Sequence, residues 1–159
     1  MRIGVLSDTH RDKFAVKRVV EFAGNVDAWF HCGDNIEDVN ILNEGSDKKV
    51  PIYFVKGNCD FSTDVPAELI VELEGKKFYI VHGNNYGIIN IAQDVMYAAM
   101  EKGCDMAVFG HTHISEIQYG EVLVMNPGSP SRPRDVQNIK TFGIITISDS
   151  KIIPEIISI

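Results

Sequence analysis

The segment Arg2-Ile3-Gly4-Val5-Leu6 is a short run, mostly apolar, that stops abruptly at the polar cluster Asp8-Thr9-His10. Four later runs have the same form. They cover residues 28–30, 52–55, 78–81 and 106–109, and they end at Gly33-Asp34, Gly57-Asn58-Cys59-Asp60, His82-Gly83 and Gly110-His111-Thr112-His113. Short apolar runs bounded by turn residues indicate buried strands. In open α/β folds, ligands bind outside the carboxyl ends of the strands. This repeated placement of Asp, Asn and His therefore predicts a dinuclear metal site.

The rest of the chain indicates an α/β fold in one domain, residues 1–159. Val16, Val19, Val20 and Ala23 form one apolar helical face that ends at Gly24-Asn25, and further helices are expected over 36–42 and 88–102. Residues 68–73 and 77–81 predict a hairpin around Gly75, and four more strands are expected over 115–119, 122–125, 142–148 and 152–157. Early helices and a strand-rich end predict two mixed β-sheets packed as a sandwich and flanked by helices, in four layers α/β/β/α.

Composition narrows the classes of protein to consider. With 23% charged and 45% hydrophobic residues the chain resembles an ordinary globular protein, and no apolar stretch reaches the ~20 residues of a membrane span. Three cysteines without a CxxC pair argue against a disulfide framework, and no signal region precedes the first strand, so we expect a reducing, cytoplasmic location. A net charge of −7 argues against nucleic acid as a partner.

The polar clusters supply a ligand set of oxygen and nitrogen atoms. Asp8 and His10 lie two residues apart, as do His111 and His113, so in extended backbone each pair would point to one side. With Asp34, Asn58 and His82 the set has seven members, and it suits Mn, Fe, Zn, Ni or Co better than Cu(I). Seven ligands give each of two metals four only if one is shared. Such a pair suits displacement at phosphorus, because it lowers the pKa of a bridging water and stabilises charged oxygens.

Each cluster alone has a plainer interpretation as a turn or a helix cap. Five of them in chain order, all at strand ends, favour the metal site. We interpret the remaining histidine, His31, as structural, and Cys32 and Cys104 as buried small hydrophobic residues.

The order Asp-x-His, Gly-Asp, Gly-Asn-x-Asp, His-Gly, Gly-His-x-His resembles the signature of the calcineurin-like metallophosphoesterases, from Asp8 to His113. The short chain and Asn126-Pro127-Gly128-Ser129 resemble the small YfcE-like phosphodiesterase subgroup. The resemblance implies that Asp8, His10 and His113 hold a first metal, that Asn58, His82 and His111 hold a second, and that Asp34 bridges them. It also implies a bridging hydroxide as nucleophile and two divalent ions, Mn first, with Ni, Zn, Fe, Co or Mg as alternatives.

One position departs from the pattern of most of the superfamily. Cys59 stands where a histidine usually follows the Gly-Asn pair and acts on the leaving oxygen. A thiol with a pKa near ~8.5 can donate a proton but carries no positive charge. We weigh a role of Cys59 as acid equally with a space-filling role. Catalytic candidates are therefore Asn58, Cys59 and Asp60, and Asp60 would lack the histidine that it orients elsewhere.

The irregular segment 126–140 is rich in Pro, Ser and Arg, and loops of this length are often functional. Asn126-Pro127-Gly128-Ser129 indicates a turn after a strand. Arg134, and after it Arg132, is a candidate for binding substrate phosphate through charge-assisted bonds.

Three functions remain after this comparison of residue types. The first is a metal-dependent phosphodiesterase of small phosphoesters. The second is a non-catalytic scaffold on the same fold, against which the complete ligand set argues. The third is a nuclease or nucleotide phosphatase. The acidic charge argues against polynucleotides but leaves nucleotides and cyclic nucleotides open. The apolar C-terminal strands also leave a homodimer open.

Overall fold

The computed structural model describes residues 1–44, 49–61, 64–87 and 89–159, and it contains two five-stranded mixed sheets. The first sheet has the strand order β10-β9-β1-β2-β3. Its strands are β1 (Arg2–Leu6), β2 (Ala28–His31), β3 (Ile52–Phe54), β9 (Thr141–Ser148) and β10 (Lys151–Ser158). The second sheet has the order β4-β5-β6-β8-β7. Its strands are β4 (Glu68–Leu73), β5 (Lys76–Val81), β6 (Met106–Val108), β7 (Ser115–Gln118) and β8 (Leu123–Pro127).

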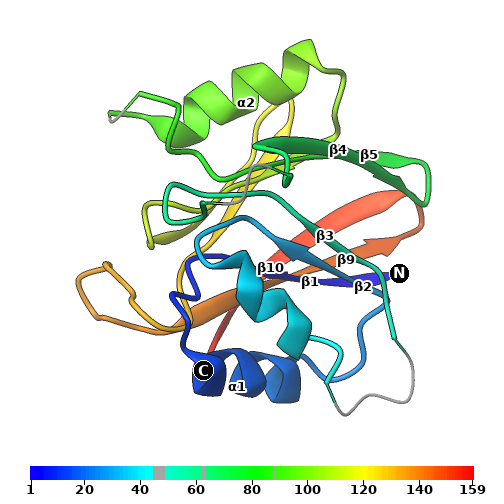
Figure 1. The fold of residues 1–159 in the computed structure, drawn as a ribbon. Coiled ribbons are helices and arrows are strands. Elements are labelled where there is room, and N and C mark those ends of the chain that lie inside the picture. Colours follow the sequence, from blue (N-terminus) through cyan, green and yellow to red (C-terminus); the bar gives the residue numbers. More distant parts are fainter. Residues whose placement is uncertain (45–48, 62–63, 88) are drawn as a thin grey trace.

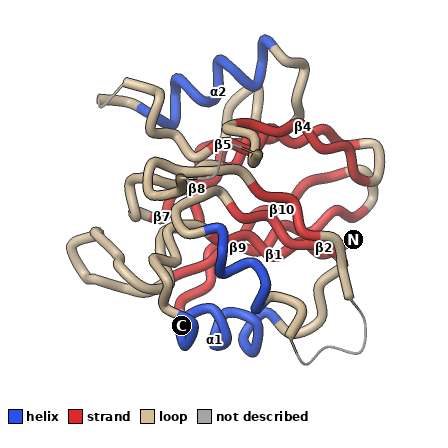
Figure 2. Tube along the Cα trace, viewed as in Figure 1, coloured by secondary structure: helices blue, strands red, loops and turns tan. Residues whose placement is uncertain are grey.

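Helices cover the outer faces of the two sheets. Helix α1 (Lys13–Ala23) and the 3₁₀ helix η1 (Ile36–Ile41) pack on the first sheet, and α2 (Ile91–Glu101) packs on the second. Figure 1 shows α1 at the bottom, α2 at the top and the strands between them, and Figure 2 shows the same arrangement by type of element. The predicted sandwich flanked by helices is confirmed.

Three apolar clusters hold the layers together. The cluster between the two sheets includes Ile3, Phe30, Phe78 and Met125. A second cluster lies between the first sheet and its helices, and a third lies under α2. Burial of this apolar surface is the dominant favourable term in folding. The layers therefore form a rigid base for the loops at the ends of the strands.

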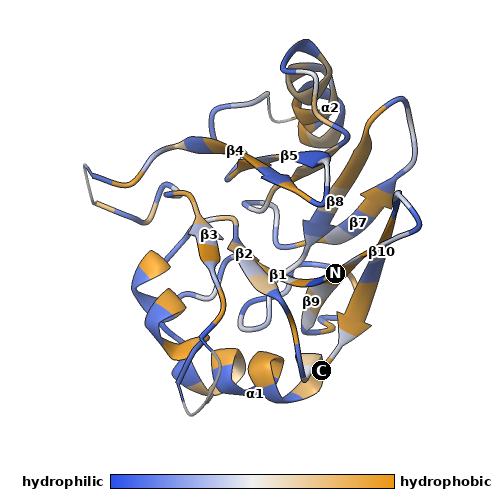
Figure 3. Ribbon diagram, turned by 90° about the vertical axis from the view of Figure 1, so that its right-hand side faces the viewer, coloured by the Kyte–Doolittle hydropathy of each residue, from blue (hydrophilic) through white to orange (hydrophobic). Residues whose placement is uncertain are grey.

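Helix α1 follows the predicted pattern of burial. Ala15, Val16, Val19 and Ala23 are buried, and Figure 3 shows hydrophobic and hydrophilic residues alternating along the helix. The carboxylate of Asp12 caps its first turn by accepting from the Ala15 amide, and Gly24 ends it with a φ of 61°.

Several element ends differ from the expected ones by one or two residues, and two differences are larger. Helix α2 begins at Ile91 rather than at Ile88, and Ile88 itself lies outside the described residues. The expected turn at Asn126-Pro127 is wrong, because both residues belong to β8 and pair with Glu116 and Ser115 of β7. The chain turns only at Gly128, which has a φ of 74°. Among the described residues, none of the helices is long and apolar enough to cross a membrane.

Candidate metal centre

The five polar clusters meet at one edge of the sandwich. Strands β1, β2 and β3 run parallel, as do β5, β6 and β8, so their carboxyl ends lie together. In Figure 1 the loops that follow these strands gather at the left side of the view. The two sheets thus bring together side chains that are as far apart in sequence as Asp8 and His113.

Asp8, His10 and His113 form the first group of ligand atoms. The His113 Nε2 lies 3.2 Å from Asp8 Oδ1 and 3.2 Å from the His10 Nε2. The chosen ligand atoms of all three lie within 4.8 Å of one another. The Nδ1 of His113 lies 2.6 Å from the backbone oxygen of Arg132, which fixes the ring and leaves Nε2 facing the group.

Asn58, His82 and His111 form the second group. The Asn58 Oδ1 lies 3.2 Å from His82 Nε2 and 3.0 Å from His111 Nδ1. His82 is fully buried, and its Nδ1 lies 2.7 Å from the Cys32 backbone oxygen, so its Nε2 faces the centre. Ligating histidines usually donate the second ring N–H to such a carbonyl.

Asp34 lies between the two groups. Its Oδ1 is 3.3 Å from the His82 Nε2, and its Oδ2 is 4.0 Å from the His10 Nε2. Burial opposes ionisation of Asp34, but the hydrogen bond and charge of His82 and the amide of Cys59 outweigh it, so the pKa of Asp34 is lowered. Each carboxylate oxygen thus faces one group, which is the placement that a bridging ligand requires.

The electrostatics of the histidines differ between positions. Burial lowers the pKa of His10, with a further contribution from His113, and burial and His82 lower the pKa of His111. Burial acts in the same direction on His82, but its hydrogen bond to Asp34 and the charge of Asp8 raise its pKa. Because ligating imidazoles must be neutral, a proton and a metal ion compete for His82.

The residues present fit a divalent cation. The Oδ1 of Asp8 is buried and accepts no hydrogen bond from any residue in the described part of the chain. Buried polar atoms are nearly always hydrogen-bonded, so a bound cation would give this oxygen the partner that it lacks among the described residues. The facing ring nitrogens of His10 and His113 also need a shared cation or proton. Oxygen and imidazole nitrogen together suit a borderline divalent ion.

The backbone that presents these ligands is not extended, and the expected i, i+2 geometry is wrong. Strand β1 ends at Leu6, and Asp8 and His10 have φ values of 56° and 48°. His111 and His113 have φ values of 67° and 61°, and they join different groups. Non-glycine residues in this left-handed region carry strain that clusters at functional sites. Turns past the strand ends, and not the pleat of the strands, therefore place the ligands.

Asp60 has no histidine at position 59 to orient, as expected, but it is well supplied with backbone partners. Its two carboxylate oxygens accept from the backbone amides of Asp34, Asn35, Ile36 and Gly57, at 2.8–3.0 Å. These bonds tie the loop after β2 to the loop after β3. Asp60 thus holds the backbone at Asp34 and does not itself face the two ligand groups.

Cys59 lies against the centre. Its Sγ is within 4.8 Å of the ligand atoms of His10 and Asp34, and it accepts from the Asn58 side-chain amide at 3.5 Å. Burial and the neighbouring carboxylate of Asp34 raise the pKa of Cys59 to about 11. The sulfur is therefore a protonated thiol at neutral pH.

Hydrogen bonds from Ser129 and Asn126 to the backbone next to the ligands were not expected from the sequence. Ser129 donates to the backbone oxygen of Asp8 at 2.8 Å, and Asn126 donates to that of Gly110 at 2.8 Å. His31, interpreted as structural, is fully buried with Nε2 3.3 Å from the Thr9 hydroxyl, and its Nδ1 accepts from the Gly33 amide. The sequence signal for Ser129 and Asn126 was their polar character in a stretch that was interpreted as a turn and as a feature of the small phosphodiesterase subgroup.

The two candidate arginines both lie on the loop after β8 and differ in position. Arg134 donates its backbone amide to the His113 oxygen at 3.1 Å. The Arg132 charge lies near enough to His10 to contribute to the lowering of its pKa, after burial and His113. Arg132 thus acts electrostatically on the first group of ligands, and the recorded contact of Arg134 with that group is made by its backbone.

Comparisons with known proteins agree with this geometry. The family model described as calcineurin-like phosphoesterase superfamily domain matches residues 1–150. The chain is 33% identical over 152 residues to the probable metallophosphoesterase YsnB of Bacillus subtilis, covering 94% of this chain and 86% of that protein. It is 29% identical to the phosphodiesterase YfcE of Escherichia coli over an alignment of 188 positions, gaps included. The alignment covers 98% of this chain and 97% of that protein.

A solved structure shows the same fold. The crystal structure of a predicted phosphoesterase from Streptococcus pneumoniae superposes with a TM-score of 0.78 at 32% identity, covering 99% of this chain and 88% of that one. A matched family model over most of the chain, a relative above 30% identity and a converging group of aspartates and histidines give one result. The chain belongs to the calcineurin-like phosphoesterase superfamily and is a metallophosphoesterase, a hydrolase of phosphoesters.

Proposed function

We propose that this protein is a phosphodiesterase that hydrolyses small phosphoesters with two divalent metal ions. The observation that carries the proposal is the position of Asp34, with one oxygen toward His82 and the other toward His10. Asp8, His10 and His113 would hold one ion, and Asn58, His82 and His111 the other. When bound, such a pair supplies an activated water, the hydroxide nucleophile, and offsets the charge of the phosphoryl oxygens.

The chain itself orients and encloses this site. The amides that bind Asp60 fix the backbone of Asp34, and we propose that Asp60 is a positioning residue. Asn58 contributes its side-chain oxygen as a ligand, and its amide group contacts Cys59. The scaffold alternative would not require ligand atoms that converge in this way.

Two roles for Cys59 stay open in the proposal. As a thiol with a pKa of about 11 it can donate a proton to the leaving oxygen, and as a neutral residue it can simply fill the space beside Asp34. We expect Cys59→His to raise or redirect hydrolysis, and Cys59→Ala to slow esters with poor leaving groups if the thiol acts as acid. Unchanged kinetics of both variants on monoesters and diesters would contradict a catalytic role.

Manganese is our first choice of metal because of the family resemblance. The mixed set of carboxylate and imidazole donors also admits Ni, Zn, Fe, Co and Mg, which are the alternatives to be compared. The cysteines at positions 32, 59 and 104 are all free thiols. Free thiols suit a reducing compartment, and we propose a cytoplasmic location.

The deciding experiment uses chelator-stripped protein, an aryl phosphodiester and the matching monoester, with each metal added in turn. We expect manganese to restore cleavage of the diester, with a smaller rate on the monoester. The Asp34→Asn variant should lose more than ~100-fold in diesterase activity. Mutation of residues that only support metal ligands already lowers metal affinity or activity by ~10–100-fold. Two bound metals without turnover of either ester would contradict the proposal and favour the scaffold.

A further inference from the structure

A pocket of about 500 Å³ opens directly beside the metal centre. It is bounded by η1, the end of β3 and the loop that follows β3. Cys59 belongs to both places, because it lines the pocket while its Sγ lies within 4.8 Å of the ligand atoms of His10 and Asp34. A group attached to a phosphate at the centre can therefore enter the pocket without leaving the site.

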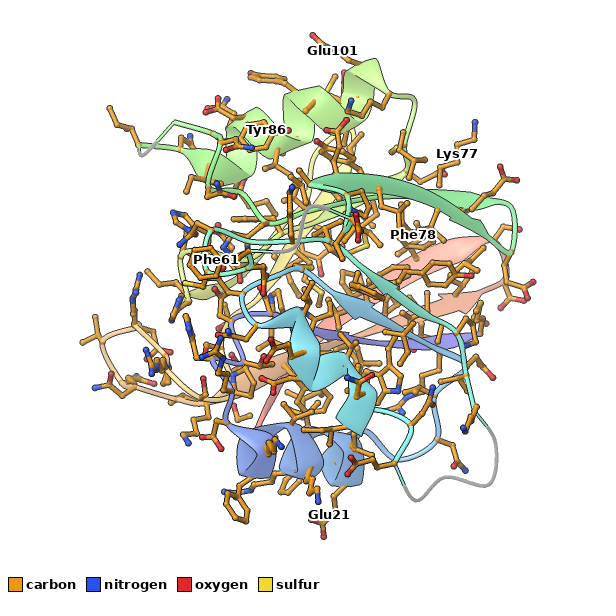
Figure 4. All side chains as sticks on the ribbon, in the orientation of Figure 1. Glu21, Phe61, Lys77, Phe78, Tyr86 and Glu101 are labelled. Atoms are coloured by element: carbon orange, nitrogen blue, oxygen red, sulfur yellow. The ribbon has the colours of Figure 1, made fainter. Side chains whose placement is uncertain are left out.

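The walls of the pocket are largely apolar. Ile36 and Val39 of η1 line it together with Phe54 of β3 and Phe61. Phe61 is 91% exposed, and Figure 4 shows it on the loop after β3, at the side of the molecule where the strands end. A large exposed aromatic ring beside an apolar pocket gains from being covered. Ligand pockets in proteins typically have this volume and this mixture of apolar walls with a few polar groups.

The polar groups of the pocket favour a neutral occupant. Asp60 lines it, but its carboxylate is already bound by four backbone amides. Arg11 and Glu37 lie at the rim 4.0 Å apart, and both side chains are mainly exposed, so their pairing is weak. A second anionic group would meet Glu37 and Asp60. A neutral ring meets the apolar walls and opposes neither carboxylate.

We propose that this pocket binds a planar aromatic group esterified to the phosphate, so that the substrates are aryl or nucleoside phosphoesters. The inference rests on the proposed function for the reaction, but the binding that it describes does not need turnover. Phe61 stacks on the ring, while Ile36 and Val39 contact its other parts. Stacking of a base on an aromatic side chain corresponds to roughly tenfold or more in affinity.

The test measures binding to the manganese-loaded protein by calorimetry, with ligands that cannot be hydrolysed. Phenylphosphonate, cyclohexylphosphonate and methylphosphonate share the phosphorus group and differ in the organic one. We expect phenylphosphonate to bind about tenfold more tightly than methylphosphonate, and more tightly than cyclohexylphosphonate, because only the planar ring stacks. The 5′-phosphonate analogue of thymidine 5′-monophosphate, which has no P–O–C ester bond, separates the two sources, since a nucleoside pocket prefers it to phenylphosphonate and a simple aryl pocket does not.

Matched variants assign the preference to Phe61. Phe61→Leu should reduce the phenyl-to-methyl ratio to within about threefold, and Phe61→Tyr, which keeps the ring, should retain it. Tyr119→Ala is the control, because Tyr119 is 75% exposed but follows β7 at the far end of that strand from Ser115, which pairs with Pro127. Equal binding of all three phosphonates, or a ratio unchanged in Phe61→Leu, would overturn the inference. Phosphonate preference without ester turnover would keep it and reject the phosphodiesterase proposal instead.

Discussion

Residues with positive φ occur at both edges of the sandwich, but they have different roles at the two edges. At the carboxyl edge of the parallel strands, Asp8, His10, Asp34, His111 and His113 all have positive φ and all belong to the candidate metal centre. At the opposite edge, Glu74, Asp149 and Ser150 have positive φ in the turns of the β4–β5 and β9–β10 hairpins. The hairpin residues are exposed, and their conformation depends only on the turn in which they lie. The ligand residues are mostly buried and depend on contacts with distant segments.

This difference shows where the stability of the centre comes from. A two-residue turn needs only a residue that tolerates the left-handed region. A buried aspartate in that region needs the surrounding structure to hold it there. For Asp34 the holding groups are Asp60, through the Asp34 amide, and Cys59, whose amide donates to the Asp34 side chain. Removal of one such contact should therefore loosen both the loop after β2 and the loop after β3.

The largest effect is expected from Asp60→Asn. An amide nitrogen in place of one carboxylate oxygen would face backbone amides that also donate, so the loop loses about 2–4 kcal/mol and the metal site opens. Metal affinity should fall by ~100-fold, the upper end of the range for residues that position metal ligands. Calorimetric metal binding and denaturant unfolding measure both quantities. Asp105→Asn is the control at the opposite edge, where Asp105 accepts from the Lys77 backbone amide and forms an ion pair with Lys76.

The pH dependence of unfolding tests a buried group at the ligand edge. Burial lowers the pKa of His31 to about 4 from 6.5, so between these values the unfolded chain binds more protons. Titration of this group should lower the stability of the metal-free protein by about 3 kcal/mol as pH drops from 6.5 to 4, and its contribution should be complete near pH 4. His31→Asn keeps an acceptor for the Gly33 amide but does not titrate. An unaltered pH slope in that variant would assign the dependence to other groups.

The elements could be predicted from the sequence, because their signals are local. The apolar face of α1, the hairpin at Gly75 and the runs ending in polar clusters all depend on neighbouring residues, and all are present. The ligand types could be predicted for the same reason. The conformation of Asp8 and His10 could not, because their positive φ values arise from contacts such as that between Ser129 and the Asp8 oxygen, 121 residues away.

The role of Asp60 was missed for a related reason. An aspartate three residues after a glycine predicts a local turn, and Asp60 does accept from the Gly57 amide. Its other three donors lie on the loop after β2, and only the packing of β2 beside β3 brings that loop within reach. Contacts of this kind depend on strand order, which local patterns do not specify.

A smaller effect is expected from a single methyl group at either edge. A Cβ on Gly57 would lie 2.1 Å from Asp34 Oδ1 and 2.6 Å from the Asp34 backbone nitrogen, so Asp34 must move. Gly57→Ala should lower metal affinity by ~10–100-fold. Gly75→Ala meets no atom within 4 Å but has a φ of 70°, so it should cost about 1–2 kcal/mol and leave metal binding unchanged. Equal metal affinity in both variants would remove the distinction between the two edges.

The smallest effect is expected from the two arginines on the loop after β8, Arg132 and Arg134, which both lie at the ligand edge. The pKa of His10 is lowered first by burial, then by His113, and to a smaller extent by the charge of Arg132. Arg132→Ala should raise KM for the diester about 3–10-fold, with kcat and metal content little changed, because an exposed cation contributes one charge-assisted contact to phosphate. Arg134→Ala should have the smaller effect, since its backbone amide and not its side chain contacts His113. The reverse order in steady-state kinetics would restore the ranking expected from sequence and would mean that the loop moves when substrate binds.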